Sequence, residues 1–167
     1  MVKPKPTQIE KFFEGEQIIV SKTDTKGIIT YGNDVFIHLS GYSEEELLGA
    51  PHNIIRHPDM PRIVFKLLWD TVEAGKEIFA YVKNLSKEGH FYWVLANITP
   101  SYDSSGKVIG YHSVRRRPRR EALEVVAPIY RELLKAEATG GMKESGRMIS
   151  ELLASKNMSY EEFVLSI

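Results

Sequence analysis

Residues 78–114, IFAYVKNLSKEGHFYWVLANITPSYDSSGKVIGYHSV, contain three extended runs separated by two polar turns. The runs are Ile78 to Leu85, His90 to Ser101 and Val108 to Val114, and each is rich in β-branched and aromatic residues. The turns, SKEG and DSSG, have the Ser, Asp and Gly content that favours reversal of the chain. This stretch therefore predicts three consecutive antiparallel strands.

Two shorter strands are predicted upstream of this stretch. Gln17 to Ser21 and Gly27 to Tyr31 are β-branched runs joined by a polar turn sequence, which indicates a hairpin. Asn33 then lies where a helix cap is expected, and Gly41 ends this short helix. A capping-box pattern follows, in which Ser43 begins a second short helix.

The longest helix of the first half is predicted between the two groups of strands. Apolar residues recur at helical spacing from Ile63 to Val72, with Trp69 among them, and Gly75 ends the segment. The order of two strands, several short helices and three strands predicts an α+β domain. We expect a five-stranded antiparallel sheet with helices on one face. We place this domain at residues 17–117, after an N-terminal extension of residues 1–16.

Residues 118–167 are predicted to form a helical C-terminal extension. We expect helices at Glu121 to Ala138, Met142 to Ser155 and Tyr160 to Ile167, with Pro128 kinking or restarting the first. The basic run RRRPRR before them is interpreted as a solvated hinge. The first helix has an apolar stripe that must be buried against the sheet, a second copy or another protein. The stripe consists of Leu123, Val126, Ile129, Tyr130 and Leu133.

The composition excludes several classes of functional site and indicates where in the cell the protein is expected. The 167 residues include no cysteine, which excludes disulfides, thiolate nucleophiles, cysteine-ligated zinc and iron–sulfur clusters. The 22 basic residues balance the 22 acidic ones, so net charge does not direct the protein to nucleic acid or anionic lipid. No apolar run approaches the roughly 18 residues needed to cross a bilayer. We therefore expect a cytoplasmic protein that associates with a membrane only through a partner, without direct insertion.

Several motifs together resemble the PAS domains of aerotaxis transducers (Aer type). The stretch GIITYGNDVFIHLSGYSEEELLG, residues 27–49, is typical of PAS domains in general. More specific are RHPDMP at residues 56–61, the tryptophan eight residues after its last proline, and the KN and YWV sequences further on. The resemblance covers residues 17–120, with weaker similarity through EVVAPIYRELL.

This resemblance implies a PAS fold that holds FAD noncovalently and reports redox or energy state. The partner it implies is a membrane-bound chemotaxis transducer, contacted at its signalling (HAMP) region. Receptors of the family continue into membrane and signalling segments, whereas this chain stops at Ile167. We therefore expect a free-standing, CetB-like energy-taxis protein, with self-association into a homo-oligomer as an alternative use of the helical extension.

The segment PHNIIRHPDM, residues 51–60, is interpreted as a wall of the flavin pocket. Trp69 and the isoleucines of this segment can form an apolar slot, and the Asn84 amide can offer a donor and an acceptor to the pyrimidine edge. Cationic and imidazole groups of the segment can address phosphate, ribose or adenine. The predicted cofactor-binding residues are His52, Asn53, Ile55, Arg56, His57, Asp59, Trp69 and Asn84.

Other interpretations of these residues remain open at this point. Trp69 can be a core residue, Asn84 a solvent-facing or capping residue, and Asp59 a helix N-cap. Haem is the alternative cofactor, with His57 or, failing that, His52 as its proximal ligand. Zinc is not expected, because the two histidines are five residues apart with no thiolate nearby. No catalytic motif is present, so we expect no enzyme activity, and a cofactor-free interaction module or a small flavoenzyme are the remaining alternatives.

Overall fold

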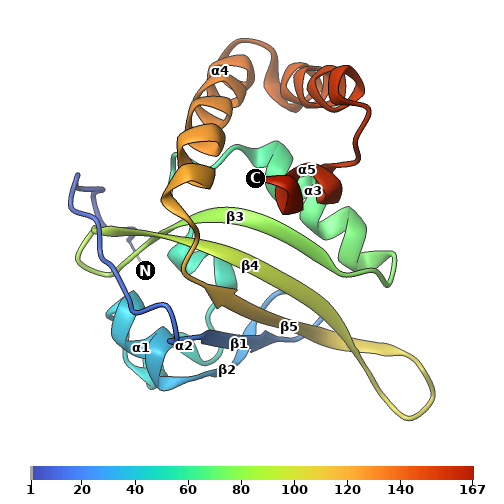
Figure 1. Cartoon of the computed structure of the whole chain (residues 1–167). Coiled ribbons are helices and arrows are strands. Elements are labelled where there is room, and N and C mark those ends of the chain that lie inside the picture. Colours follow the sequence, from blue (N-terminus) through green and yellow to red (C-terminus); the bar gives the residue numbers. More distant parts are fainter. Residues whose placement is uncertain (1) are drawn as a thin grey trace.

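The computed structural model describes residues 2–167, and its centre is one five-stranded antiparallel sheet (Figure 1). The strand order is β2-β1-β5-β4-β3, and every neighbouring pair is antiparallel. The predicted α+β fold with a five-stranded sheet is confirmed. The strands are β1 (Ile19–Thr23), β2 (Ile29–Gly32), β3 (Ile78–Leu85), β4 (Phe91–Tyr102) and β5 (Val108–Arg116).

Aspartate side chains shape two of the turns between strands. Asp24 Oδ1 accepts hydrogen bonds from the backbone N–H groups of Lys26 at 2.8 Å and Ile28 at 3.0 Å. Asp103 Oδ1 accepts from Ser105 at 2.8 Å and Lys107 at 3.0 Å in the same way. These bonds satisfy backbone donors that the sheet cannot pair, which is why Asp is favoured at such positions.

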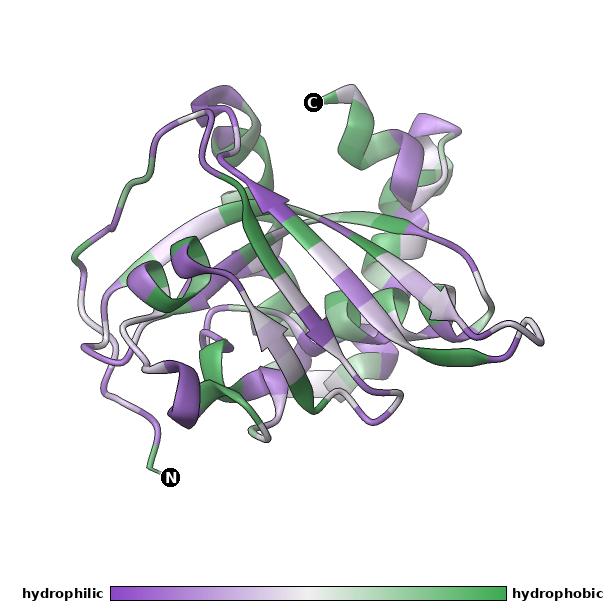
Figure 2. Ribbon diagram, turned by 90° about the horizontal axis from the view of Figure 1, so that it is seen from below, coloured by the Kyte–Doolittle hydropathy of each residue, from purple (hydrophilic) through white to green (hydrophobic). Residues whose placement is uncertain are grey.

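Short helices follow the first hairpin and cover one face of the sheet. They are α1 (Asp34–Ser40), α2 (Glu44–Leu47), a 3₁₀ turn η1 (His52–Ile55) and α3 (Arg62–Glu73). Hydrophilic and hydrophobic residues alternate along the strands (Figure 2), because successive side chains of a strand point to opposite faces of the sheet. The predicted caps are present: Ser43 and Glu46 form a capping box, and Gly41 ends α1 in the left-handed conformation.

Asn33 fastens α1 to the sheet. Its Oδ1 accepts from the backbone N–H of Phe36 at 3.1 Å, as a helix cap does, and also from Val20 at 3.0 Å. Its Nδ2 donates to the carbonyl of Ile18 at 2.8 Å. One side chain therefore joins the start of α1 to the start of β1.

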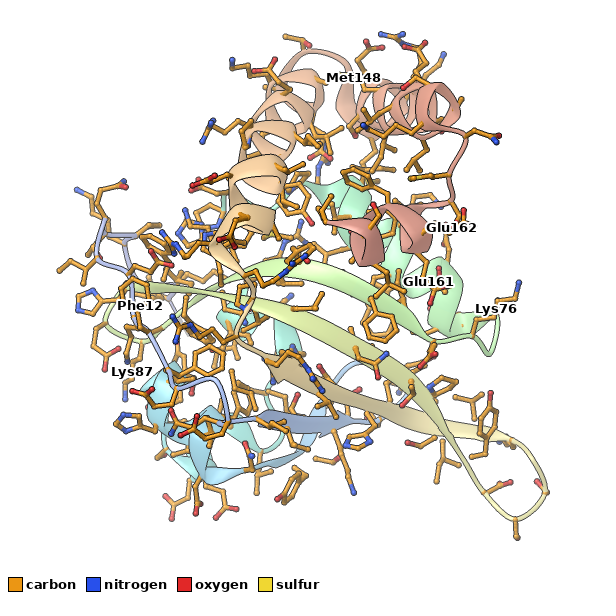
Figure 3. All side chains as sticks on the ribbon, viewed as in Figure 1. Phe12, Lys76, Lys87, Met148, Glu161 and Glu162 are labelled. Atoms are coloured by element: carbon orange, nitrogen blue, oxygen red, sulfur yellow. The ribbon has the colours of Figure 1, made fainter. Side chains whose placement is uncertain are left out.

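The C-terminal extension packs on the other face of the sheet. Its helices are α4 (Arg120–Lys156) and α5 (Tyr160–Ser166), which lie above the sheet in Figure 1 while α1 and α2 lie below it. Their side chains fill the space between the helices and the sheet (Figure 3). Val126, Tyr130 and Leu133 are buried in the same core as the strands. The apolar stripe of α4 is therefore buried against the sheet of its own chain.

The C-terminal helices break at Gly141, between the helices predicted at Glu121 to Ala138 and Met142 to Ser155. The predicted restart at Pro128 is wrong, because α4 continues through this residue with helical backbone angles. Proline removes only one helical hydrogen bond, and Val126 and Tyr130 on either side of it are buried. Gly141 has φ 66° and ψ −165°, a conformation that strongly favours glycine, and it separates α4 into two arms.

The N-terminal segment extends the sheet beyond the end of β5. The backbone of Phe91 in β4 donates to the carbonyl of Ile9 at 3.0 Å, and Lys11 donates back to Phe91 at 2.7 Å. Glu10 pairs with Arg120 at 2.8 Å, at the start of α4. The N-terminal extension thus lies against both the sheet and the C-terminal helices.

The contacts of Asn33 give a first prediction, in which Asn33→Ala is compared with Asn33→Asp. We expect Asn33→Ala to lower the free energy of unfolding by about 1–3 kcal/mol, since two backbone donors lose their acceptor. Asn33→Asp keeps the acceptor and loses only the bond to Ile18, so it should cost less. Urea denaturation of both variants measures the difference. Equal losses would show that the shared cap is not what fastens α1.

Candidate functional site

A cavity of about 360 Å³ lies between α3, η1 and the inner face of the sheet. This volume falls in the range of about 300–1,000 Å³ that is usual for small-molecule sites. Its walls come from β1, the loop before β2, η1, α3 and the inner sides of β3, β4 and β5. Six of the eight predicted site residues line it, namely His52, Asn53, Ile55, Arg56, Trp69 and Asn84.

Trp69 forms the apolar wall on the α3 side and packs closely against Gly27. A Cβ atom on Gly27 would lie 3.3 Å from the indole ring, and Gly27 has a φ of +79°. The positive φ favours glycine at this position, and the close approach of Trp69 leaves little room for a side chain. The Trp69 ring also meets Tyr111 edge-on, with centroids 5.3 Å apart. Trp69 is therefore a packed core residue and a cavity residue at once.

The segment before α3 crosses the edge of the sheet, and this crossing decides which of its side chains reach the cavity. Arg56 forms an isolated antiparallel bridge with Asn84, at the outer edge of β3. Neighbouring residues in an extended chain point to opposite sides. Arg56 accordingly lines the cavity, with its guanidinium 4.2 Å from the centroid of the Phe65 ring, whereas His57 does not line it.

His57 and Asp59, both predicted to contact a cofactor, do not line the cavity. His57 is buried outside the cavity lining, where its Nδ1 accepts from the backbone of Asp59 at 3.0 Å. Its ring meets Phe91 edge-on at 6.2 Å. The Asp59 carboxylate is bound by Lys83 Nζ at 2.6 Å. Asp59 thus ties the loop to β3 and His57 packs against Phe91 of β4, and neither residue lines the cavity.

Asn84 presents an unsatisfied polar group to the cavity. The residue is buried in β3, and its Nδ2 has no hydrogen-bond partner within residues 2–167. Buried amide groups are nearly always paired, because leaving one unpaired costs free energy. An N–H donor without a protein partner is therefore available at the cavity wall.

Arg115 is a candidate binding residue that the sequence interpretation missed. It lines the cavity, is buried, and donates from Nη2 to Ser21 Oγ at 2.8 Å. Its guanidinium lies 4.5 Å from the centroid of the Phe36 ring, and its Nε and Nη1 have no partner in the described residues. None of the acidic side chains described lies within ion-pair distance of it.

The signal for Arg115 was the alternation of β5. Tyr111 and Ser113 line the cavity, and the next inward position along the strand is Arg115. The sequence interpretation ended the strand at Val114 and assigned the following arginines to a solvated hinge. Continuing the two-residue period by one step would have placed Arg115 inside.

His52 is kept neutral beside this buried cation. Its Nε2 lies 2.9 Å from Ser21 Oγ, and its ring stacks on Phe36 with centroids 5.9 Å apart. Ser21 Oγ accepts from Arg115, and its own hydroxyl proton is available to donate to His52 Nε2. Burial, together with the positive charge of Arg115, lowers the pKa of His52 to about 3. The wall therefore carries one fixed positive charge and one neutral imidazole.

Neither a metal-binding cluster nor a membrane-spanning helix is found in the described part of the chain. Within residues 2–167, no group of three or more His, Asp or Glu side chains is arranged to hold a metal ion. In the same part of the chain, none of the helices combines the length and apolar character that a bilayer-spanning segment needs.

A family model described as the PAS fold matches residues 29–115, which is 87 of the 167 residues. The chain belongs to the PAS family. The aerotaxis receptor of Escherichia coli (strain K12) is 41% identical over 130 residues, which cover 78% of this chain and 26% of the receptor. The chain is accordingly an Aer-type PAS domain, and it spans about a quarter of the length of that receptor.

Solved structures of light-oxygen-voltage (LOV) domains share this fold. The blue-light photoreceptor Aureochrome1 LOV in its dark state has a TM-score of 0.58 and 23% identity, covering 66% of this chain and 82% of its own. A LOV domain studied with a flavin analogue also has a TM-score of 0.58, with 20% identity, and covers 66% of this chain and 83% of its own. These similarities establish the PAS/LOV architecture of the sheet and its helices.

The low pKa of His52 gives a second prediction, on the pH dependence of stability. The unfolded chain takes up a proton on His52 near pH 6.5, whereas the folded protein does so only near pH 3. The unfolded state thus binds more protons in this window, and the free energy of unfolding should fall as the pH falls through it. The slope from one such group approaches about 1.4 kcal/mol per pH unit.

The measurement is denaturant unfolding at pH 7, 6 and 5 for the wild type and His52→Gln. The variant should lose stability less steeply, although His57, whose pKa burial lowers to about 4, retains its own contribution. Parallel curves for the two proteins would mean that His52 titrates normally. As an independent check, Arg115→Met should raise the pKa of His52 in an NMR titration.

Proposed function

We propose that this PAS domain binds FAD noncovalently in the cavity and senses redox or energy state for a chemotaxis transducer, without catalysing a reaction. The observation that carries this proposal is Arg115, a buried cation without a carboxylate partner in a cavity wall. Burying such a charge costs several kcal/mol unless a partner compensates it. The carbonyl oxygens and ring nitrogens of a flavin can accept hydrogen bonds from this cation and so act as such a partner. The similarity to an aerotaxis receptor and to a LOV domain studied with a flavin analogue supports the same assignment.

FAD supplies reversible uptake of electrons and protons, and the side chains would control the environment in which this occurs. Arg115 favours whichever state of a ligand carries more negative charge, because its own charge is fixed and shielded from water. The Asn84 amide can present its donor or its acceptor, and so can follow a change in the hydrogen-bonding pattern of a ring edge. Trp69 and Ile55 offer the apolar surfaces that a flat ring requires.

The mouth of the cavity supports a flavin that carries phosphate over one that does not. Lys26 and Asn53 line the cavity and are exposed, and Arg56 is partly exposed beside them. Cationic and amide donors at the solvent side suit a pyrophosphate. A ligand without phosphate would leave these donors unused. This arrangement matches FAD with its ring inside and its charged group at the mouth.

The strand β3 provides a route from the cavity to a partner. Asn84 faces the cavity from this strand, while the carbonyl of Tyr81 accepts a hydrogen bond from Tyr130 Oη of α4 at 2.6 Å. The helix α5 also packs on β3. A change at Asn84 can therefore be passed by direct contact to the C-terminal helices, and from them to a membrane-bound transducer or to a second copy of the chain.

Absorption spectroscopy of the purified protein, before and after addition of FAD, tests the cofactor assignment. Visible flavin bands and release of intact FAD on denaturation are expected. A Soret band would assign the cavity to haem instead. A colourless protein that refuses added FAD would make this domain an interaction module and overturn the proposal.

A third prediction concerns Arg115→Met, which has two opposite consequences. FAD binding should weaken by about 10- to 100-fold, because a charge-assisted contact worth about 1.5–3 kcal/mol is lost. The FAD-free protein should unfold at the same temperature or a higher one, since a buried unpaired charge has been replaced by an apolar side chain of similar length. Equilibrium binding and thermal unfolding measure the two effects. A variant that loses stability and keeps its FAD affinity would make Arg115 a structural residue.

A fourth prediction concerns Arg56 at the mouth of the cavity. Arg56→Gln should weaken FAD binding by about tenfold and leave riboflavin binding nearly unchanged, because riboflavin lacks the pyrophosphate. The matched control is Lys66→Ala, which removes one positive charge from the exposed side of α3, where Lys66 pairs with Asp70. Equal losses for FAD and riboflavin would show that Arg56 does not contact the phosphates.

A further inference from the structure

The helix α3 begins without a cap of its own. Its N-cap position is Pro61, which provides no side-chain hydrogen bond. The first N–H groups of any helix lack partners within the helix and need acceptors from elsewhere. In α3 this need is acute for Ile63, which is buried.

Glu137, in the first arm of α4, supplies the missing acceptors from 75 residues away. Its Oε2 accepts from the backbone N–H of Arg62 at 3.0 Å, and its Oε1 accepts from the backbone N–H of Ile63 at 2.9 Å. The guanidinium Nε of Arg62 lies 3.4 Å from the same carboxylate. A carboxylate at this end of a helix is also favoured by the helix dipole.

The same carboxylate holds the second arm of α4. Ser145, which follows the break at Gly141, donates from Oγ to Glu137 Oε1 at 3.1 Å. Gly146 packs against Ile63, so that a Cβ atom there would lie 3.5 Å from Ile63 Cδ1. Glu137 therefore lies where the two arms of α4 and the start of α3 meet.

The environment keeps Glu137 ionised at this junction. Its side chain is only 6% exposed. Burial alone would raise the pKa of Glu137, but the hydrogen bonds from Arg62, Ile63 and Ser145 outweigh it and the pKa is lowered. The groups that contact this carboxylate from α3 and from the second arm of α4 are hydrogen-bond donors, which favour its ionised form.

The elements that Glu137 joins include a wall of the cavity. Phe65 lies within one turn of the capped end, and Leu68 and Trp69 follow on the same helix, all three lining the cavity. Arg56 is also within its electrostatic reach: burial lowers the pKa of Arg56, and the Glu137 carboxylate acts in the opposite direction. Displacing Glu137 would therefore release the start of α3 and alter Arg56 together.

We propose that Glu137 is a positioning residue of the cofactor cavity, through which docking of the C-terminal helices and binding of FAD strengthen each other. This inference rests on the proposed FAD site. Such a coupling is reciprocal: if docked helices raise the affinity for FAD, bound FAD must stabilise the docked helices by the same factor. The stability with which the C-terminal arm, residues 142–167, docks on the domain then depends on whether the cavity is occupied.

Affinity for FAD is the first measurement, made on the full chain with Glu137→Gln and Glu137→Ala. We expect FAD binding to weaken by about 3- to 30-fold, the range that corresponds to loss of a helix cap. Ser145→Ala, which leaves the charge in place, is a milder second variant and should weaken binding less. The control is Glu132→Gln on the same helix, where Glu132 is exposed and pairs only with Lys135. This control should bind FAD as the wild type does.

Hydrogen–deuterium exchange of residues 142–167 is the second measurement, since a merely structural cap would not make it depend on FAD. Addition of FAD should slow exchange in this arm of the wild type and of Glu132→Gln, and should have little effect in Glu137→Gln. If the wild type binds FAD but the Glu137 variants keep the wild-type affinity, the coupling is overturned and the proposed function stands. The same holds if exchange in these variants still slows on addition of FAD. A wild type that binds no FAD would overturn the proposed function and the coupling with it.

Discussion

A positive charge enclosed by the inner face of the sheet is the constraint on which the site depends. Arg115 is placed there by the pairing of β5 between β1 and β4, and protein groups satisfy only part of its hydrogen-bonding capacity. Ser21 and the face of Phe36 compensate it in part, and His52 stays uncharged beside it. The remainder of the cost is carried by the packing of the whole domain, and a ligand of suitable charge would relieve it.

The elements that form the cavity walls also contact the C-terminal helices, so the site and the helical extension are structurally connected. On one side, β3 carries Asn84 inward and offers the Tyr81 carbonyl to Tyr130 on the other face. On the other side, Glu137 caps the helix that carries Trp69. Two separate hydrogen-bonded contacts thus join elements that are distant in sequence. A rearrangement of the cavity that disturbs either one changes how the helices are held.

The sequence predicted what depends on local patterns and missed what depends on distant pairing. The bounds of β3, the caps at Asn33 and Ser43, and the cavity position of Trp69 follow from periodicity, capping chemistry and family motifs. The burial of Arg115 required the end of β5 to be known to one residue. The position of His57 outside the cavity depends on where the chain crosses the edge of β3. The Glu137 cap joins residues that are distant in the sequence. Neither feature was predictable from local patterns.

The use of the α4 stripe inside the domain limits how a signal can leave it. An apolar face that is already buried against the sheet cannot bind a transducer while it stays there, so a partner must contact exposed surface or a part of the extension that detaches. The second arm of α4 is the candidate for such a part, because Gly141 interrupts the helix and the arm docks on α3 through the Glu137 junction. The first arm, held by Val126, Tyr130 and Leu133, buries far more apolar surface. Movement of the second arm alone could therefore transmit a signal without exposing the core of the sensor.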